Sequence, residues 1–331
     1  KHSIEKQIAH YVDCFTTVSE ITNNECKELL DKPADVVLMN GFEDDFVPKG
    51  ATFTGKRKRA RSTMLRVANC LLGEDLGDDT LIIGTSGRYE FKNKGIDVFL
   101  ESLNRLNRDK DLKKKVLAFV NVPSWVGDPR EDLQKRLKSK DKFTEPLQCP
   151  FITHWLHNMT HDQVLDMLKY LGMGNRPEDK VKVIFVPCYQ DGHDGILNKH
   201  YYDLILGEDL SVYPSYYEPW GYTPLESVAF RVPTITTDLA GFGLWVNSLK
   251  NQHGINDGVE VLHRSDYNYS EVADGIKDTV ALFSTKTEAE IKEIRKRAGQ
   301  VAEQALWKHF IQYYYEAYDI ALRKARIRQL S

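Results

Sequence analysis

Short hydrophobic runs alternate with amphipathic stretches along most of the 331-residue chain. Buried strands of a parallel sheet give such short runs, and the helices that cover the sheet give the amphipathic stretches. The expected strands are residues 14–18, 36–39, 80–83, 116–120, 181–186, 210–213, 234–236 and 259–262. The expected helices lie near residues 19–31, 57–72, 95–108, 129–139, 160–171, 198–207 and 223–230. The pattern predicts an α/β fold, with a Rossmann-like parallel sheet and helices on both of its faces.

Two changes in the pattern divide the chain. Residues 46–58 are rich in Gly, Pro, Lys and Arg, a composition typical of a linker. After residue 270 the hydrophobic positions recur only at helical spacing. We therefore expect a short leading piece, residues 1–45, and a main domain, residues 46–331, that ends in helices.

The composition argues against several classes of protein. Lys and Arg total 45 against 48 Asp and Glu, so the formal charge is −3, which argues against nucleic acid as the main partner. No hydrophobic run approaches the roughly 18–20 residues that cross a membrane, and we expect no secretory leader. The five cysteines are scattered without a C-x-x-C pair, as in cytoplasmic proteins with reduced thiols. Because the sequence opens on Lys1, we expect it to be a piece of a longer chain.

Two motifs near the start of the main domain suggest sites that their surroundings do not support. Residues 50–56 have the glycine and lysine spacing of a nucleotide-binding P-loop, but Arg57 stands where that loop needs Ser or Thr to hold magnesium. The basic cluster at residues 56–61 is typical of a solvated loop and helix start when the overall charge is balanced. Neither motif is taken as a site.

Three histidines invite a metal interpretation. His154, His157 and His161 have spacings of three and four, which bring imidazoles to one face of a helix. An expected helix N-cap close to this stretch argues against a single helix, and no nearby cysteine or pair of acids completes a site. We expect no metal and no cofactor.

The loop at residues 84–95 carries two cations between an expected strand and an expected helix. In an open parallel sheet, ligands bind beyond the carboxyl ends of the strands, where this loop would lie. Arg88 can hold two phosphate oxygens with its planar guanidinium, and Lys94 adds a compact charge. The loop is a candidate anion site, with a charged surface loop as the alternative.

The most informative segment is YEPWGYTPLE, residues 217–226. Its last four residues form a capping-box sequence with proline at the first helical position, so we expect a helix to begin at Thr223 and to present unpaired backbone N–H groups to a phosphate. Glu226 would then bond back to the cap or hold ribose hydroxyls. Glu218 lies in the loop before Gly221 and is the better candidate for contact with a sugar. Together with the 84–95 loop, this segment predicts a nucleotide-sugar site.

These segments resemble the signatures of the eukaryotic-type glycogen synthases, glycosyltransferase family 3. The similar segments are SGRYEFKNKG at 86–95, YYEPWGYTPLE at 216–226, TTDLAGFG at 236–243, HSIEK at 2–6, FTTVSEIT at 15–22 and NGF at 40–42. They follow one another in the family's order over almost the whole chain. The resemblance implies the C-terminal half of a GT-B glycosyltransferase, with residues 1–45 as a remnant of the N-terminal domain and 46–331 as the nucleotide-sugar-binding domain.

The resemblance also implies a reaction and a role for each residue. The family transfers glucose from UDP-glucose to the non-reducing end of an α-1,4-glucan, with retention of configuration and without a metal. By resemblance, Arg88 and Lys94 hold the diphosphate and stabilise the departing UDP, and Glu218 holds the donor glucose. Tyr201 falls where the family stacks a ring on uracil, and Glu226 takes the ribose hydroxyls. The other candidates for the donor site are Trp220, Gly221, Tyr222, Thr223 and Lys6.

Two departures from the family pattern change what we expect. Lys6 replaces an arginine, which keeps the charge but loses the bidentate fork. The helix that senses glucose-6-phosphate in eukaryotic members corresponds here to residues 293–298, with only three basic residues. We therefore predict weak or absent activation by that effector, as in a bacterial member. Because most of the first domain is missing, we also predict donor binding without appreciable transfer.

Several alternatives remain at this level. A non-catalytic glucan-binding or scaffolding module would use the aromatic 216–226 loop as a sugar platform. Another GT-B transferase would use the same site with a different donor or acceptor. UDP and ADP carry the same diphosphate, so the sequence leaves the donor base open. It also leaves open the acceptor length and the oligomeric state, including a homo-oligomer of the full-length protein.

Overall fold

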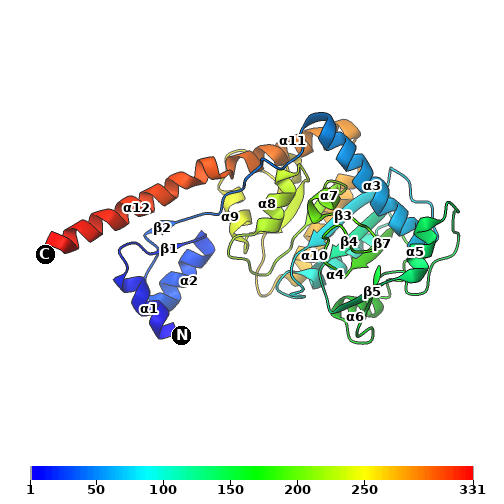
Figure 1. Ribbon diagram of the computed structural model, residues 1–331, viewed down its shortest axis with the longest axis horizontal. Helices are drawn as coiled ribbons and strands as arrows, with labels where there is room; N and C mark the ends of the chain where they lie inside the picture. The colour runs from blue at the N-terminus through cyan, green and yellow to red at the C-terminus, as the bar shows by residue number, and fades with distance from the viewer. Residues whose placement is uncertain (1, 331) are drawn as a thin grey trace.

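A parallel sheet forms the main body of the protein, and a computed structural model describes it within residues 2–330. The strands are β3 Leu81–Ser86, β4 Val116–Asn121, β7 Val181–Val186, β8 Leu210–Val212, β9 Thr234–Thr237 and β10 Val259–Leu262. They pair in the order β10-β9-β8-β3-β4-β7, and every pair is parallel (Figure 1). The predicted Rossmann-like sheet is confirmed.

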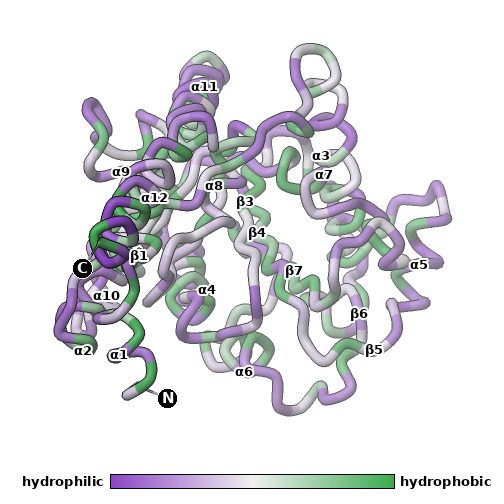
Figure 2. Tube along the Cα trace, turned by 60° about the vertical axis from the view of Figure 1, so that its left-hand side comes forward, coloured by the Kyte–Doolittle hydropathy of each residue, from purple (hydrophilic) through white to green (hydrophobic). Residues whose placement is uncertain are grey.

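Helices bury both faces of the sheet, as its continuous hydrophobic strands require. Along β4, Val116, Ala118 and Val120 pack into the same core as helices α4 (Ile96–Asn107) and α10 (Tyr269–Ser284). The alternate residues Leu117 and Phe119 pack with helix α3 (Gly50–Leu72). Figure 2 shows hydrophobic residues gathered along β4 and β7 and polar residues toward the periphery.

Shorter elements surround this core. The remaining helices of the main body are α5 Glu131–Lys138, α6 Gln163–Tyr170, α7 Tyr201–Ile205, α8 Tyr222–Ala229, α9 Gly241–Asn247, α11 Glu288–Gln304, α12 Trp307–Leu330 and the 3-10 helix η1 Ile255–Asp257. An antiparallel pair consists of β5 Val126–Pro129 and β6 His154–Leu156. The predicted strands and helices are present, with ends that shift by a few residues. The sequence pattern missed α9, β5, β6 and η1, which are short and carry no periodic hydrophobic signal. It also missed a helix of ten residues at the start of the chain, α1 His2–Tyr11.

The start of the chain forms a small piece of its own, which the last helix crosses. It contains α1 His2–Tyr11, β1 Thr16–Thr17, α2 Glu20–Leu30 and β2 Val36–Val37, and β1 pairs with β2 in parallel. Figure 1 shows α12 extending from the main body over this piece. Lys324 on α12 pairs with Asp35 at 3.2 Å, and Arg328 pairs with Asp13 at 2.9 Å. The two ends of the chain therefore lie together.

The predicted linker at residues 46–58 is wrong from Gly50 onward, because α3 begins there. Arg57 donates to the carbonyls of Leu206 and Glu208, both at 2.7 Å, and pairs with Asp209 at 2.6 Å. These tertiary contacts stabilise a helix that composition alone does not favour. The same contacts show that the basic cluster is not simply solvated, and residues 50–56 are helical and form no P-loop.

Candidate functional site

The candidate site lies where the order of the strands reverses. From β3 the chain proceeds to β4 and β7 on one side, and from β8 it proceeds to β9 and β10 on the other. The loops that leave neighbouring strands β3 and β8 therefore diverge and leave a crevice at the carboxyl edge, where open α/β sheets bind ligands. The first loop carries Arg88 and Lys94, and the second carries Glu218. The two candidate segments thus meet at one edge of the sheet.

Lys94 and Glu218 form an ion pair in this crevice. The Nζ of Lys94 lies 2.5 Å from Oε2 of Glu218, and the two side chains are only 12% and 18% exposed. The hydroxyl of Ser215 donates a second hydrogen bond to Oε2 at 3.3 Å. Because water has little access, the attraction is stronger than in an exposed pair. The predicted cation and the predicted acid are direct neighbours.

The backbones of the 84–95 loop and of the loop after β8 are in direct contact. The Tyr216 N–H donates to the carbonyl of Asn93 at 2.8 Å. Gly95 has a φ of +67°, and a Cβ at this position would lie 2.1 Å from the carbonyl oxygen of Pro214. Only glycine fits both the angle and the space. This contact explains the glycine that directly follows Lys94.

The 236–243 segment fixes Glu218 from the other side. The Glu218 N–H donates to the carbonyl of Leu239, and its own carbonyl accepts from the N–H of Gly241, both at 3.0 Å. A Cβ on Gly241 would lie 2.3 Å from the carbonyl oxygen of Pro219. These contacts fix the backbone of the loop, and with it the position from which the Glu218 side chain extends.

Arg88 lines a cavity of about 350 Å³, which we call the Arg88 cavity. The Arg88 side chain is 77% exposed, and its Nη1 lies 3.0 Å from Glu90. An exposed cation with one carboxylate partner can turn toward an anionic ligand at little cost. The cavity is lined by Ser86, Gly87, Arg88, Tyr89, Asn121, Pro123, Cys188, Tyr189, Gln190, Tyr201 and Thr223. Three of the site residues predicted from the sequence therefore line the Arg88 cavity together: Arg88, Tyr201 and Thr223.

Tyr201 is held by hydrogen bonds at the wall of this cavity. Its hydroxyl lies 3.0 Å from the Ser86 hydroxyl, which is 3.4 Å from the hydroxyl of Tyr213. Burial raises the pKa of Tyr201 well above its usual value, so the phenol stays neutral. A fixed, neutral aromatic ring provides a surface on which a planar base can stack.

A second cavity, of about 510 Å³, contains Glu218, and we call it the Glu218 cavity. Its lining includes Gly221 and Tyr222 from the signature loop, and Thr16 and Asn40 from the start of the chain. Tyr222 lines the Glu218 cavity and the next residue lines the Arg88 cavity. The start of α8 therefore lies between the two.

The predicted capping box is wrong. Helix α8 begins at Tyr222 with Gly221 as its N-cap, at a φ of +111°, and no side chain caps it. Glu226 lies one turn inside the helix and accepts a hydrogen bond from the Tyr202 hydroxyl at 2.8 Å. Burial raises the pKa of Glu226, and its side chain lines neither cavity. A backbone that needs positive φ at residue 221 overrides the Thr223 cap signal. The ribose contact stays a prediction.

Two other predicted residues, Trp220 and Lys6, make contacts within the protein itself. Trp220 is 3% exposed and packs edge-on against Phe242 and Phe310, so its indole is part of the core beneath the Glu218 cavity. Lys6 lies on α1, where it pairs with Asp31, and it lines neither cavity. Both remain predictions as donor-site residues.

The three histidines do not form a cluster on one helix. His154 belongs to β6, and His157 and His161 lie in the following segment before α6. Ligand atoms of His154, Cys188 and Asp194 do lie within 4.8 Å of one another. The ring nitrogens of His154 lie 2.9 Å from the Thr153 hydroxyl and 2.8 Å from the Asp194 carbonyl. The Asp194 carboxylate accepts three backbone N–H groups. The imidazole and the carboxylate are thus already hydrogen-bonded within the protein. The expectation of no metal stays a prediction.

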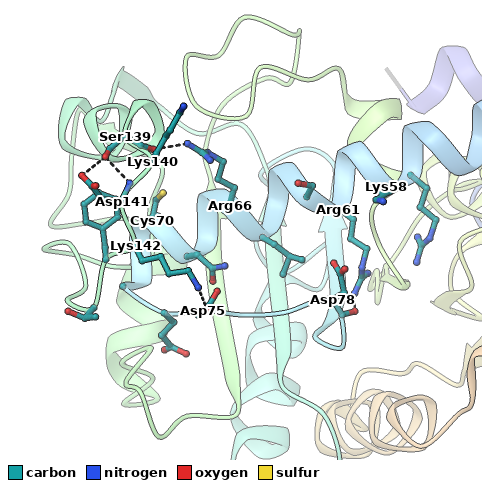
Figure 3. Close-up of a pocket in the computed structure, with 18 of the residues that line it drawn as sticks. Lys58, Arg61, Arg66, Cys70, Asp75, Asp78, Ser139, Lys140, Asp141 and Lys142 are labelled. Carbon is teal, nitrogen blue, oxygen red and sulfur yellow. Dashed lines mark hydrogen bonds and ion pairs between the residues drawn. The ribbon is translucent and has the colours of Figure 1, made fainter.

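A basic groove along α3 is separate from this site. The groove, of about 880 Å³, runs between α3 and residues 139–144, and Figure 3 shows its charged side chains. Lys142 pairs with Asp75 at 2.7 Å, and Arg66 donates to the carbonyl of Ser139 at 3.0 Å. Arg61 pairs with Asp209 at 2.7 Å. Most of its cations are thus engaged by the protein itself.

Polar residues at the ends of β4 and just beyond β7 were missed by the sequence analysis. Asn121 is the last residue of β4, and Gln190 lies four residues after β7 ends. Both line the Arg88 cavity. The rule that ligands bind beyond the carboxyl ends of parallel strands would have pointed to them, had it been applied to every strand.

Comparison with known proteins identifies the family of the chain. A sequence model of the family described as Glycogen synthase matches residues 1–128 and 129–330. The chain belongs to the glycogen synthase family. It is 29% identical to glycogen [starch] synthase isoform 2 of Saccharomyces cerevisiae, over 98% of this chain and 55% of that protein. For the glycogen [starch] synthase of Neurospora crassa, the identity is 28% over 98% of this chain and 54% of that protein. The chain spans about half the length of these curated relatives.

Solved structures show the same fold at low sequence identity. Sucrose-phosphate synthase from Thermosynechococcus elongatus matches with a TM-score of 0.53 and 17% identity, over 99% of this chain and 61% of that one. Anabaena HepE, solved in complex with UDP and glucose, matches with a TM-score of 0.55 and 15% identity, over 96% of this chain and 65% of that one. The fold is that of the GT-B glycosyltransferases. Among residues 2–330, no helix combines the length and the hydrophobicity needed to cross a bilayer.

Proposed function

We propose that this chain is the donor-binding half of an enzyme that transfers glucose from UDP-glucose to the non-reducing end of an α-1,4-glucan, with retention of configuration. Membership of the glycogen synthase family supports the class of reaction. The observation that carries the proposal is the placement of Arg88, Tyr201 and Thr223 around one cavity, next to the Lys94–Glu218 pair. Anabaena HepE, which shares the fold, was solved in complex with UDP and glucose, and this supports a nucleotide-sugar as the kind of ligand.

In this proposal three groups hold the diphosphate. The Arg88 guanidinium supplies a bidentate contact, and the Lys94 ammonium supplies a point charge. The free N–H groups at the start of α8, near Thr223, supply hydrogen bonds from a helix N-terminus. Positive charge placed in advance stabilises the negative charge that grows on UDP as it leaves. These cations do the work for which other transferases use a metal.

Glu218 faces the sugar in the proposed complex. Its carboxylate holds glucose hydroxyls and supports the positive character that develops at the anomeric carbon. The clamp on its backbone by Leu239 and Gly241 limits the reorganisation needed during the reaction. Lys94 pairs with the same carboxylate, so one ion pair joins the diphosphate end of the donor to its sugar end.

We propose that the chain binds the donor but does not turn it over at an appreciable rate. The Glu218 cavity has a wall from the start of the chain, but the relatives are about twice as long. The missing part of such a protein would supply acceptor contacts and the rest of the cleft. An assay that follows labelled glucose from UDP-glucose into glycogen is expected to show no incorporation.

The basic residues of α11 support weak or absent activation by glucose-6-phosphate. Arg295 is buried and donates to the carbonyl of Glu208 at 3.1 Å. Arg297 pairs with Asp257 at 2.6 Å, and Lys296 lies 3.7 Å from Glu293. These contacts already engage each of the three cations. Strong activation of the full-length enzyme by glucose-6-phosphate would contradict this part of the proposal.

Calorimetric titration with UDP tests the proposed donor site. We expect UDP to bind the chain, and we expect Arg88→Ala to weaken binding about 10- to 100-fold, because a charged hydrogen bond contributes roughly 1.5–3 kcal/mol. Arg59→Ala is the matched control, since Arg59 is an exposed cation on α3 outside the Arg88 cavity. Absence of UDP binding, or equal affinity in Arg88→Ala and the unaltered chain, would contradict the assignment.

A further inference from the structure

Arg264, in the segment after β10, is a buried cation with little hydrogen bonding. The residue is only 6% exposed. Its Nε and Nη1 atoms are buried and have no hydrogen-bond partner within residues 2–330. Burial of a charged group without hydrogen bonds costs free energy, so a neutral side chain of similar size would suit the interior at least as well. The stability of the fold therefore gives no reason for an arginine at this position.

Two aromatic rings lie next to the Arg264 guanidinium. Its Cζ atom is 5.5 Å from the centroid of the Tyr216 ring and 5.7 Å from the centroid of the Tyr269 ring. Both distances are in the range of cation–π attraction, and a planar guanidinium can stack on a ring as an ammonium cannot. Tyr269 begins α10, and Tyr216 lies two residues before Glu218. Arg264 thus connects the body of the fold to the loop that carries Glu218.

Tyr216 is held at three points. Its N–H donates to the carbonyl of Asn93 at 2.8 Å, its hydroxyl donates to the carboxylate of Asp266, and its ring makes the cation–π contact. Asn93 directly precedes Lys94 in the other loop of the crevice. The position of Tyr216 therefore sets where Glu218 lies relative to Lys94.

Arg264 also interacts with the two other segments that build the crevice. Its N–H donates to the Oδ1 of Asp238 at 2.8 Å, and the next residue, Leu239, accepts the N–H of Glu218. Burial raises the pKa of Asp97 at the start of α4, while a backbone hydrogen bond and the Arg264 charge oppose this rise. A single side chain and its backbone thus link the segments around residues 97, 216 and 238.

We propose that Arg264 is a positioning residue for the sugar end of the donor, which fixes Tyr216 and, through Tyr216, the Glu218 carboxylate. This inference rests on the proposed function, which puts glucose at Glu218. Neither Arg264 nor Tyr216 lines the Arg88 cavity, where the proposed function puts UDP. The residue therefore acts on the affinity for the sugar and not on the affinity for the nucleotide.

Calorimetric titration with UDP and with UDP-glucose tests this inference. Arg264→Met keeps an unbranched side chain but has neither charge nor a planar group. We expect the ratio of the UDP-glucose affinity to the UDP affinity to fall about tenfold, the factor for about one misplaced hydrogen bond, while the UDP affinity changes less than twofold. We expect the midpoint of thermal unfolding to stay the same or to rise, because the variant removes a buried charge. Arg264→Lys keeps the charge without the planar group and is expected not to restore the ratio.

A double-mutant cycle tests whether the effect passes through Tyr216. Tyr216→Leu removes the ring and keeps the backbone N–H, so we expect it to lower the same ratio about tenfold and to add little when it is combined with Arg264→Met. Arg136→Met is the matched control. Arg136 lies over the Phe143 ring at 4.5 Å, and neither residue lines either cavity of the site. The control is expected to keep the full ratio.

The outcomes separate this inference from the proposed function. An unchanged ratio in Arg264→Met, or an equal loss of affinity for UDP and UDP-glucose, would overturn the positioning role and leave the donor site intact. Additive effects in the double variant, or a full ratio in Arg264→Lys, would overturn the action through the Tyr216 ring. Absence of binding by both UDP and UDP-glucose to the unaltered chain would overturn the proposed function and the inference with it.

Discussion

The groove along α3 and the Arg88 cavity both contain cations, but their hydrogen-bonding states differ. In the groove, Arg66 donates to the carbonyl of Ser139 (Figure 3), and Arg61 pairs with the carboxylate of Asp209. In the cavity, Arg88 is exposed, and the amides of Asn121 and Gln190 keep free donors. The comparison teaches that unused hydrogen-bonding capacity, more than the number of basic residues, distinguishes a ligand site from a structural cluster.

The buried acid beneath α3 provides the largest test of this difference. Asp209 pairs with Arg57 and Arg61 at 2.6 and 2.7 Å and is 7% exposed. Burial acts to raise the pKa of Asp209, but the two arginines and the hydrogen bond from the Ile82 N–H together hold that pKa below its usual value. We expect Asp209→Ala to lower the free energy of unfolding by about 3–5 kcal/mol, because it leaves buried cations unpaired. Urea denaturation measures the change.

A control in the same groove makes the test specific. Asp75 pairs with Lys142, but both side chains are more than three-quarters exposed, at 76% and 82%. Asp75→Ala is expected to change the free energy of unfolding by less than about 1 kcal/mol. A loss of equal size in the two variants would contradict the structural role given to the buried cluster. UDP affinity is expected to stay the same in Asp75→Ala.

The contact between the two loops of the site provides the next test. Gly95→Ala introduces a Cβ at 2.1 Å from the Pro214 carbonyl oxygen in a backbone with a φ of +67°. We expect a loss of about 2–4 kcal/mol of stability and weaker UDP binding, because the crevice must open. Gly172→Ala has the same φ of +67° with nothing within 4 Å, so it isolates the cost of the angle, about 1–2 kcal/mol. Equal losses in the two variants, measured by urea denaturation, would show that the loops do not need this close approach.

A test of a different kind concerns pH. Burial raises the pKa of Glu208 to about 8, neighbouring Asp209 acts in the same direction, and the hydrogen bond from Ser211 opposes them. Between the usual value of 4.5 and about 8, the folded chain keeps a proton that the unfolded chain releases. Stability therefore falls as pH rises through this window, by at most about 1.4 kcal/mol per pH unit.

Replacement of this carboxyl group isolates its contribution. Glu208→Gln keeps the size of the side chain and cannot titrate, so we expect the fall in the free energy of unfolding between pH 5 and pH 8 to be reduced. Urea denaturation at several pH values measures the slope. A slope equal to that of the unaltered chain would contradict the proposed protonation of Glu208.

The main sheet could be predicted because its strands are continuous hydrophobic runs. β4 and β7 are buried on both faces, so their sequences carry a strong signal. The loops after β3 and β8 were also predicted from the fold, and their residues Lys94 and Glu218 do meet. The order of strands and helices along the chain, with the rule that ligands bind at the carboxyl ends of parallel strands, was enough to predict where these two loops lie.

Contacts distant in sequence account for what the sequence did not show. α3 starts at Gly50 because its arginines find partners near residue 208, about 150 residues away along the chain. The N-cap of α8 moves to Gly221 because the loop needs a positive φ there, whereas Thr223 had the expected cap sequence. The hydrogen bond between Asn121 and Gln190 joins the end of β4 to the segment after β7, and no local sequence pattern marks it. Such features depend on partners that only the folded chain brings together.

A crystal structure of the chain with UDP tests the central claim most directly. We predict the diphosphate between Arg88 and the start of α8, and the base on Tyr201. UDP bound in the groove along α3, or bound at the Arg88 cavity with its base turned away from Tyr201, would contradict the assignment of the donor site.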